Sequence, residues 1–138
     1  MIGLVLICHG DLAQTFLRTA EEIVGPIEGV VCISNKGKSP AVVRAEVDRA
    51  LAGFAGAEGV LIMADLFGSS CWRCGFEELY GPTGRDDTVA VIAGVNLGML
   101  LSFTQKRHTL CFRELATVLA GDGRRGISGP TFASETRR

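Results

Sequence analysis

The chain alternates short apolar runs with longer stretches in which apolar residues recur at helical spacing, and glycine or proline stands at nearly every junction. Short continuous apolar runs are typical of strands that are buried on both faces. Their alternation with helices is the pattern of βαβ units, so we expect a three-layer α/β sandwich in which helices flank a mainly parallel, four-stranded sheet. The expected strands are Ile2–Cys8, Val30–Ile33, Val60–Ala64 and Thr88–Ala93.

The helices between these strands are predicted from their apolar stripes and their end signals. The first has Asp11 as a candidate cap, with Gln14 completing a capping box, and it stops at Gly25-Pro26. The second begins at Pro40, a residue favoured at the first helical position. The remaining expected helices begin near Ser70 and cover roughly Leu97–Gln105 and His108–Ala120.

Length and composition indicate one domain. With 138 residues, of which 47% are hydrophobic, the chain can bury a core without disulfides or metal. We expect the domain to cover residues 1–128, with a short edge strand near its end. The last stretch, residues 129–138, is polar and is expected to be a disordered tail.

The charge balance excludes several classes of partner. Lys and Arg number 14 against 15 Asp and Glu, for a net charge of −1, so no excess charge attracts nucleic acid or an acidic membrane surface. No apolar run approaches the ~20 residues of a membrane helix, and the first run lacks the basic start of a signal peptide. We therefore expect a cytoplasmic protein whose cysteines are reduced.

Polar side chains follow three of the expected strands at the point where each strand ends. His9 comes directly after the first strand, Asp65 after the third, and Asn96 shortly after the fourth. The carboxyl ends of parallel strands meet at one edge of the sheet, where ligands bind in open α/β folds. The turn Gly68-Ser69-Ser70, which leads into a helix, adds backbone N–H donors at the same edge.

This set of residues fits phosphoryl transfer. A neutral imidazole is a good nucleophile toward phosphorus, so His9 is the candidate nucleophile. Asp65 would hold the proton on one ring nitrogen and leave the other free to attack. Gly68, Ser69 and Ser70 would bind the phosphoryl oxygens. Positioning and charge stabilisation carry such a transfer, so no metal or other cofactor is required.

Other interpretations stay open at this point. A histidine or an aspartate at a strand end is often only a hydrogen-bonded structural residue or a helix cap. The pair Cys71-x-x-Cys74 at a predicted helix start could be a dithiol redox centre, or could bind a metal together with His9 and Asp65. A receiver-like regulator phosphorylated on Asp65 is disfavoured, because the first strand does not end in the acidic pair that holds Mg²⁺.

Three separated motifs resemble one known family. They are Cys8-His9-Gly10-Asp11 after the first strand, the segment Gly59–Ser70, and Gly94-Val95-Asn96-Leu97-Gly98 after the fourth strand. In this order they resemble the IIA component of the mannose/fructose class of bacterial sugar phosphotransferase systems. The resemblance covers roughly residues 1–128. It implies an additional antiparallel edge strand, here Arg125–Gly129, and a homodimer in which this strand can be exchanged.

The resemblance also implies a role for each candidate residue. His9 would be phosphorylated on the ring nitrogen that faces away from Asp65, and Ser70 would lie on the phosphate side. Gly68 and Ser69 correspond to the family's two-glycine turn. Phe67 is expected to pack beside the histidine, and Asn96 to shape the loop of the site.

The implied partners are proteins. His9 would accept a phosphoryl group from the phosphocarrier protein HPr and pass it to a separate IIB protein. The chain would then serve sugar uptake or its regulation without touching sugar itself.

Overall fold

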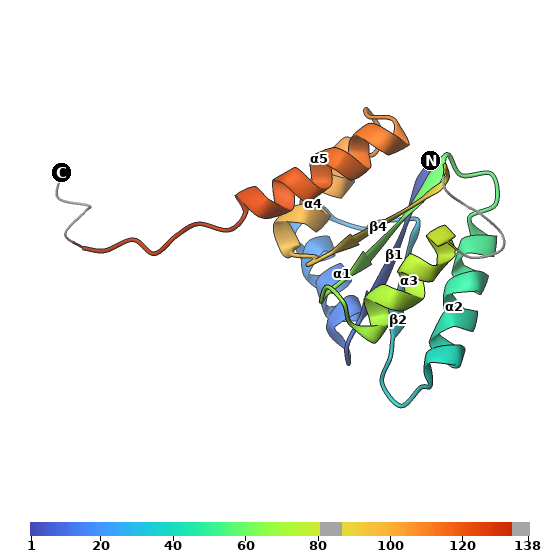
Figure 1. Cartoon of the computed structure of the whole chain (residues 1–138). Coiled ribbons are helices and arrows are strands. Elements are labelled where there is room, and N and C mark those ends of the chain that lie inside the picture. The colour runs from blue at the N-terminus through green and yellow to red at the C-terminus, as the bar shows by residue number, and fades with distance from the viewer. Residues whose placement is uncertain (81–86, 134–138) are drawn as a thin grey trace.

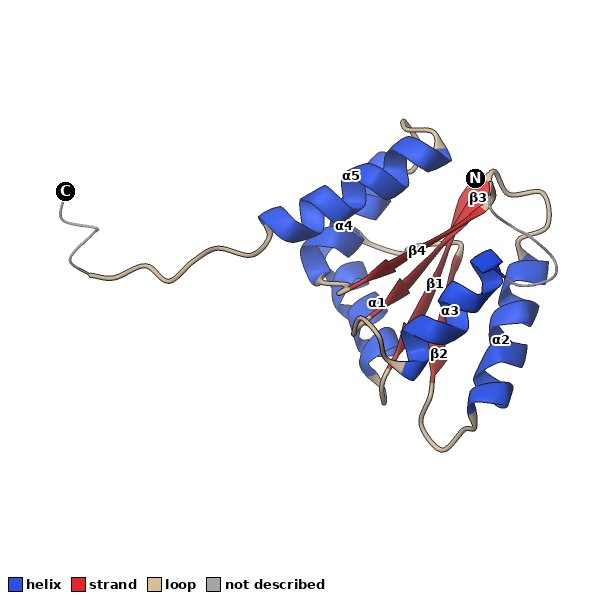
Figure 2. Cartoon of the chain, viewed as in Figure 1, coloured by secondary structure: helices blue, strands red, loops and turns tan. Residues whose placement is uncertain are grey.

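The computed structural model describes residues 1–80 and 87–133, and within them the chain forms four strands and five helices (Figures 1 and 2). The strands are β1 (Ile2–Cys8), β2 (Val30–Ser34), β3 (Gly59–Ala64) and β4 (Val89–Ala93). The helices are α1 (Leu12–Val24), α2 (Pro40–Gly53), α3 (Ser70–Tyr80), α4 (Leu97–Lys106) and α5 (Phe112–Arg125). No helix in these residues is long and apolar enough to span a membrane.

All pairings in the described sheet are parallel, and the strand order is β2-β1-β3-β4. The chain first moves from β1 to β2 on one side, and then returns to place β3 on the other side of β1. The point between β1 and β3 is therefore the topological switch of the sheet, where open α/β folds leave a crevice at the carboxyl ends of the strands. The register pairs Ile7 with Ala64, so the residues that follow these strands emerge next to each other.

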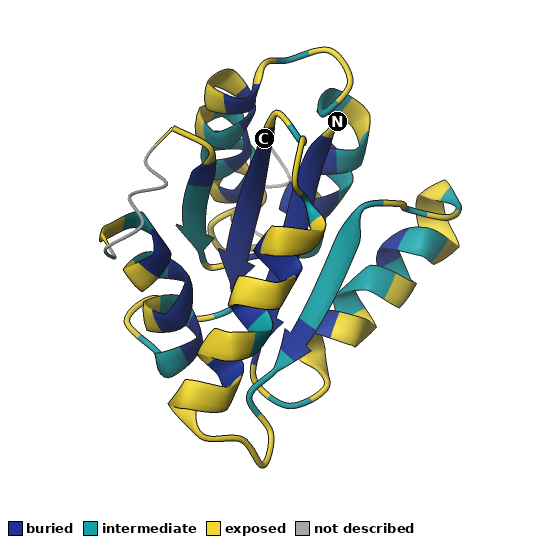
Figure 3. Ribbon diagram, turned by 90° about the vertical axis from the view of Figure 1, so that its right-hand side faces the viewer, coloured by how far each residue is buried: buried dark blue, intermediate teal, exposed yellow. Residues whose placement is uncertain are grey.

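The sheet lies between two layers of helices, as the apolar runs predict. Along β1, Leu4 and Leu6 belong to the core cluster formed with α1, α4 and α5, whereas Val5 and Ile7 belong to the cluster formed with α2 and α3. Figure 3 shows the resulting pattern, in which the central strands are buried and the outer helix faces are exposed. The three-layer α/β architecture is confirmed. Both faces of β1 and β3 are covered, and this explains why their sequences are continuous apolar runs.

The starts of α1 to α4 match the predictions, whereas α5 begins at Phe112, four residues after the predicted start at His108. Ser39 caps α2 by accepting a hydrogen bond from the Val42 N–H at 3.3 Å, and Pro40 follows as the first helical residue. Asp11 stands at the cap position of α1, but its side chain makes no capping hydrogen bond, so the predicted capping box is wrong. Its backbone conformation, with φ −93° and ψ 11°, differs from the extended conformation that a capping side chain requires.

An acidic residue of α5 joins this helix to α4. Asp122 accepts hydrogen bonds from Lys106 Nζ at 2.6 Å and from the Ser102 hydroxyl, and it also pairs with Arg125. The hydrogen bond from Lys106, followed by the one from Ser102, lowers the pKa of Asp122 from 3.8 to about 2.

The end of the chain differs from the expectation. The last helix continues to Arg125, whereas its periodicity predicts an end near Ala120. The glycine that suggests a break, Gly123, is a close-approach position: a Cβ there would lie 2.4 Å from Met99 Cε of α4. The expected antiparallel strand Arg125–Gly129 does not form within the residues that the structure describes, and the segment after α5 leads away from the domain (Figure 1). Of the expected tail, residues 134–138 lie outside the described part of the chain.

Candidate functional site

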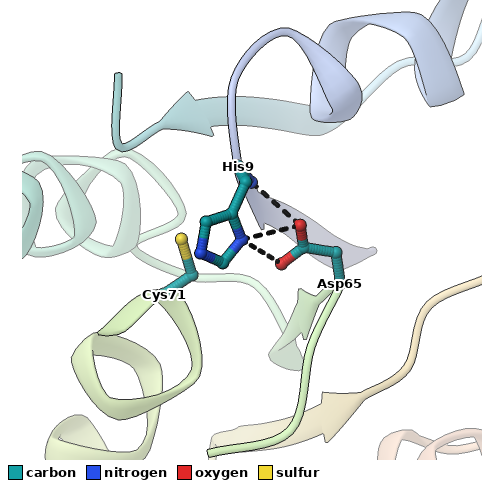
Figure 4. Close-up of side chains that lie close together, drawn as sticks. All are labelled: His9, Asp65 and Cys71. Atoms are coloured by element: carbon teal, nitrogen blue, oxygen red, sulfur yellow. Dashed lines mark hydrogen bonds and ion pairs between the residues drawn. The ribbon is translucent and has the colours of Figure 1, made fainter. Parts of the chain in front are cut away.

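His9 and Asp65 meet at the switch point, as their positions after β1 and β3 predict (Figure 4). The Asp65 carboxylate accepts a hydrogen bond from the His9 backbone N–H at 2.9 Å. The same carboxylate contacts His9 Nδ1 through both oxygens, at 3.1 and 2.9 Å. Because an ionised carboxylate can only accept hydrogen bonds, this contact assigns the ring proton to Nδ1.

The other ring nitrogen of His9 is left with its lone pair. Among the described residues, Nε2 makes no hydrogen bond, and the side chain is 45% exposed against 11% for Asp65. A ring that is oriented through one nitrogen and open at the other is the arrangement that a nucleophilic imidazole requires.

The loop that carries His9 is held by residues that sequence reasoning missed. Gly10 has φ +55°, a conformation that favours glycine, and it turns the chain from β1 toward α1. The Ser34 hydroxyl donates to the Gly10 carbonyl at 2.6 Å, and the Gly10 N–H donates to Asn35 Oδ1 at 3.3 Å. Ser34 ends β2 and Asn35 follows it, so both lie at the same edge of the sheet as His9, and the strand order β2-β1 brings them to Gly10.

The three predicted phosphate-binding residues, Gly68, Ser69 and Ser70, differ in what they do in the turn before α3. Gly68 takes φ +75°, so it supplies the turn. Ser69 acts as a helix cap, since its hydroxyl donates to the Leu66 carbonyl at 2.8 Å and accepts from the Trp72 N–H at 3.2 Å. Ser70 begins α3, and in the described structure neither its N–H nor that of Cys71 is used in a backbone hydrogen bond. Within the described residues, neither N–H group is bonded to a backbone carbonyl, and both stand at the positive end of the helix.

Phe67 packs on an aromatic neighbour of α3. Its side chain is exposed, and its ring centroid lies 4.9 Å from that of Trp72. The row continues along the helix through Phe76 and Tyr80, with centroid separations of 4.5 and 4.7 Å. Sequence reasoning did not identify this aromatic row, although its members in α3 stand four residues apart.

Asn96 caps α4 and bonds to α5. Its Oδ1 caps α4 by accepting from the Met99 N–H at 3.0 Å, and its Nδ2 donates to the Gly123 carbonyl at 3.1 Å. Asn96 therefore fixes α5 against the start of α4 beyond the end of β4.

Cys71 is the third functional group beside His9. One ligand atom from each of His9, Asp65 and Cys71 lies within 4.8 Å of the other two, and Figure 4 shows the imidazole between the carboxylate and the sulfur. Cys74 points elsewhere, with its Sγ 3.9 Å from the Pro40 carbonyl. Both cysteines border a hollow of about 100 Å³ between the start of α3 and the loop after β2.

The two cysteines of the Cys-x-x-Cys pair lack the features of an activated dithiol. Burial, followed by the nearby carboxylate of Asp65, raises the pKa of the Cys71 thiol to about 11. Burial also raises the pKa of Cys74. Reactive redox cysteines need a lowered thiol pKa and access to solvent, so the dithiol alternative gains no support.

Known proteins that are similar to this chain in sequence or fold indicate its family. The sequence matches the family described as "PTS system fructose IIA component" over residues 3–119. No match is found among curated proteins. The phosphotransferase system component EIIA from Streptococcus agalactiae is similar in fold, with a TM-score of 0.84 at 24% sequence identity, over 94% of this chain and 97% of that chain.

Two further solved structures are similar in fold. For the mannose/sorbose-specific IIA subunit from Enterococcus faecalis, the TM-score is 0.78 at 23% identity, covering 94% of this chain and 95% of that one. For the PTS IIA protein associated with the fucose utilization operon of Streptococcus pneumoniae, the TM-score is 0.79 at 17% identity, covering 99% of this chain and 95% of that one. Since the family match spans most of the domain that carries His9 and Asp65, the chain belongs to the family of IIA components of the sugar phosphotransferase system.

Proposed function

We propose that this chain is a phosphocarrier that accepts a phosphoryl group from phospho-HPr on Nε2 of His9 and passes it to a separate IIB protein. The observation that carries the proposal is the imidazole oriented by Asp65 through Nδ1, at 2.9 Å, with Nε2 open on a side chain that is 45% exposed. Family membership supports the donor and acceptor proteins, and either sugar uptake or its regulation as the destination.

In the transfer to His9, the Nε2 lone pair forms the new N–P bond while the bond between phosphorus and the donor atom of phospho-HPr breaks, and that donor atom keeps the electron pair. The proton stays on Nδ1, where the Asp65 carboxylate stabilises the positive charge of the phosphorylated ring. The transition state is loose, so the reaction is accelerated mainly by aligning His9 with the donor and by hydrogen-bond donors to the phosphoryl oxygens.

The phosphoryl oxygens would be bound by the turn before α3. We assign this role to the backbone at Gly68 and to the N–H groups of Ser70 and Cys71, together with the Ser70 hydroxyl. These groups stand at the positive end of an 11-residue helix, which favours an anion. The Ser69 hydroxyl serves mainly as the cap, and Phe67 and Asn96 shape the surrounding loops.

The test is direct phosphorylation of the purified chain. Incubation with phospho-HPr should add one phosphate by intact mass, and mild acid should remove it because phosphohistidine is acid-labile. The sequence has two histidines, so His108→Ala is a matched control. The adduct should vanish in His9→Ala and persist in His108→Ala. An adduct that persists in His9→Ala, or none in the unchanged chain, would refute the proposal.

We also propose a homodimer formed through the segment after α5. Ile127 and Phe132 in this segment are 78% and 59% exposed, and among the described residues β4 pairs only with β3. A groove of about 550 Å³ runs beside β4, between α3 and α5, and has Ile127 at its border. Light scattering should give twice the chain mass, and the double variant Ile127→Asp/Phe132→Asp should give the monomer. A monomeric unchanged chain would contradict the dimer.

We also propose that the protein works in the cytoplasm. All five cysteines are free, which suits a reducing compartment. Phospho-HPr and the IIB acceptor would meet His9 there.

A further inference from the structure

We propose that His9, Asp65 and Cys71 form a binding site for a thiophilic divalent cation of the zinc class. The three side chains come from the ends of β1 and β3 and from the first turn of α3. One ligand atom from each lies within 4.8 Å of the other two. In the part of the chain that the structure describes, no other set of three histidine, cysteine or acidic side chains comes this close.

The donor set fits this class of cation. Imidazole nitrogen, thiolate sulfur and carboxylate oxygen are the ligands that Zn²⁺ takes in proteins, and three protein ligands with one open position are common. Tetrahedral coordination with these bond lengths separates neighbouring ligand atoms by roughly 3.5 Å. The observed separations of up to 4.8 Å therefore need to close by about 1.3 Å at most, which small rotations of the three side chains can supply.

The charges of the site also suit a divalent cation. The carboxylate and the thiolate together carry two negative charges, and coordination releases the Sγ proton to solvent. Lys38, the cation that borders the adjoining hollow, is already paired with Glu46 at 2.8 Å. Hard cations such as Mg²⁺ prefer oxygen ligands, so they should bind here poorly.

The consequence for function rests on the proposed phosphocarrier role. If Nε2 coordinates, the nucleophile is occupied. If Nδ1 coordinates, the proton moves to Nε2, and the lone pair needed for attack is lost. Either way, the cation and the phosphoryl group exclude each other on the same ring, so zinc would inhibit the phosphorylation of His9.

Cobalt serves as the spectroscopic probe for the site. The full chain carrying Cys111→Ser, which removes the exposed thiol, is titrated with Co²⁺ alone under a thiol-free reductant. We expect one equivalent to bind with a thiolate-to-cobalt charge-transfer band, and Zn²⁺ to displace it. The band should vanish in Cys71→Ser and persist in Cys74→Ser, a matched change of a buried cysteine on the same helix.

A second variant covers the case in which Cys71→Ser does not fold. His9 is half exposed, so His9→Asn should leave the circular dichroism spectrum unchanged and weaken Co²⁺ binding at least tenfold. The absence of the band in the Cys111→Ser chain, its persistence in a folded Cys71→Ser variant, or its loss in a folded Cys74→Ser variant would overturn the site.

The metal titration contains no phosphoryl donor, so it can fail or succeed independently of the proposed function. Phosphorylation is measured separately, with chelator and with one equivalent of Zn²⁺. A cobalt band without phosphorylation in chelator would support the metal site and refute the phosphocarrier role. Phosphorylation without a cobalt band would support the carrier and refute the metal site. With both intact, Zn²⁺ should slow phosphorylation at least tenfold and chelator should restore it; an unchanged rate would overturn the mutual exclusion.

Discussion

Replacing Asp65 with asparagine tests the central contact of the site. The carboxylate accepts hydrogen bonds from both the His9 backbone N–H and Nδ1, each at 2.9 Å from the same oxygen. An amide has one accepting oxygen and one NH₂ group. If the oxygen keeps the backbone N–H, the NH₂ faces Nδ1, and Nδ1 must then accept. The ring proton moves to Nε2, and the proposed nucleophile loses its lone pair.

The magnitude follows from these two losses. One charge-assisted hydrogen bond contributes about 1.5–3 kcal/mol, and it is strongest when the phosphorylated ring is positive. The tautomer change adds a further loss, and in a Ser-His-Asp triad the same substitution lowers kcat by about 10⁴. For Asp65→Asn we expect the single-turnover rate of phosphorylation to fall by about 10²–10⁴, since each 1.4 kcal/mol corresponds to about a factor of ten.

The assay is rapid-quench phosphorylation by phospho-HPr, followed by intact mass, with circular dichroism to check the fold. Asp11→Asn is the matched control, because Asp11 is exposed, stands two residues from His9 and makes no side-chain capping hydrogen bond. It removes the same charge near the ring and should change the rate by less than about threefold. A folded Asp65→Asn variant within tenfold of the unchanged chain would show that Asp65 does not orient the ring.

Three further predictions concern stability and thiol chemistry. The pKa of Asp122 is lowered from 3.8 to about 2 in the folded protein. Its ionisation therefore stabilises the fold above pH 3.8, and this contribution is lost as the pH falls toward 2. In the Asp122→Asn variant, Tm should fall less steeply across that pH range. Gly75→Ala places a Cβ 2.8 Å from Ile62 Cγ2, and the overpacking should cost about 1–2 kcal/mol by urea unfolding after the gain in helix propensity is counted. Gly121→Ala, whose Cβ would meet only a flexible arginine at 3.4 Å, should instead stabilise by about 0.5–1 kcal/mol; equal signs for the two would contradict this packing. At pH 8 a thiol reagent should react quickly with Cys111 alone, and with all five cysteines after unfolding; a second fast thiol would revive the dithiol interpretation.

The meeting of His9 and Asp65 could be predicted because it depends on very little of the sequence. Each residue directly follows a strand, and parallel strands end at one edge. The strand order was not predictable from the runs themselves, since Val30–Ser34 and Val60–Ala64 are equally apolar candidates for either side of β1. The hydrogen bonds of Ser34 and Asn35 to Gly10 depend on that order, so they also stayed hidden.

The end of α5 could not be predicted because glycine has two opposite meanings in a helix. Glycine ends helices where the backbone needs a positive φ. It also occurs inside helices where a neighbouring segment packs closely against the backbone. Gly123 is of the second kind, with Met99 against its Cα face and its carbonyl accepting from Asn96. Only the packed structure distinguishes the two, because the partner residues lie more than twenty positions earlier.

The Cys71-x-x-Cys74 pair shows why spacing alone misleads at a helix start. Residues three apart share a helix face, and both cysteines face the sheet. Each residue also rises 1.5 Å along the axis, so Cys74 lies about 4.5 Å farther from the end of α3 that faces His9. The pair is thereby divided: Cys71 reaches the imidazole and the carboxylate, and Cys74 reaches the Pro40 carbonyl. Burial therefore raises the pKa of both thiols, whereas the Asp65 carboxylate raises only that of Cys71.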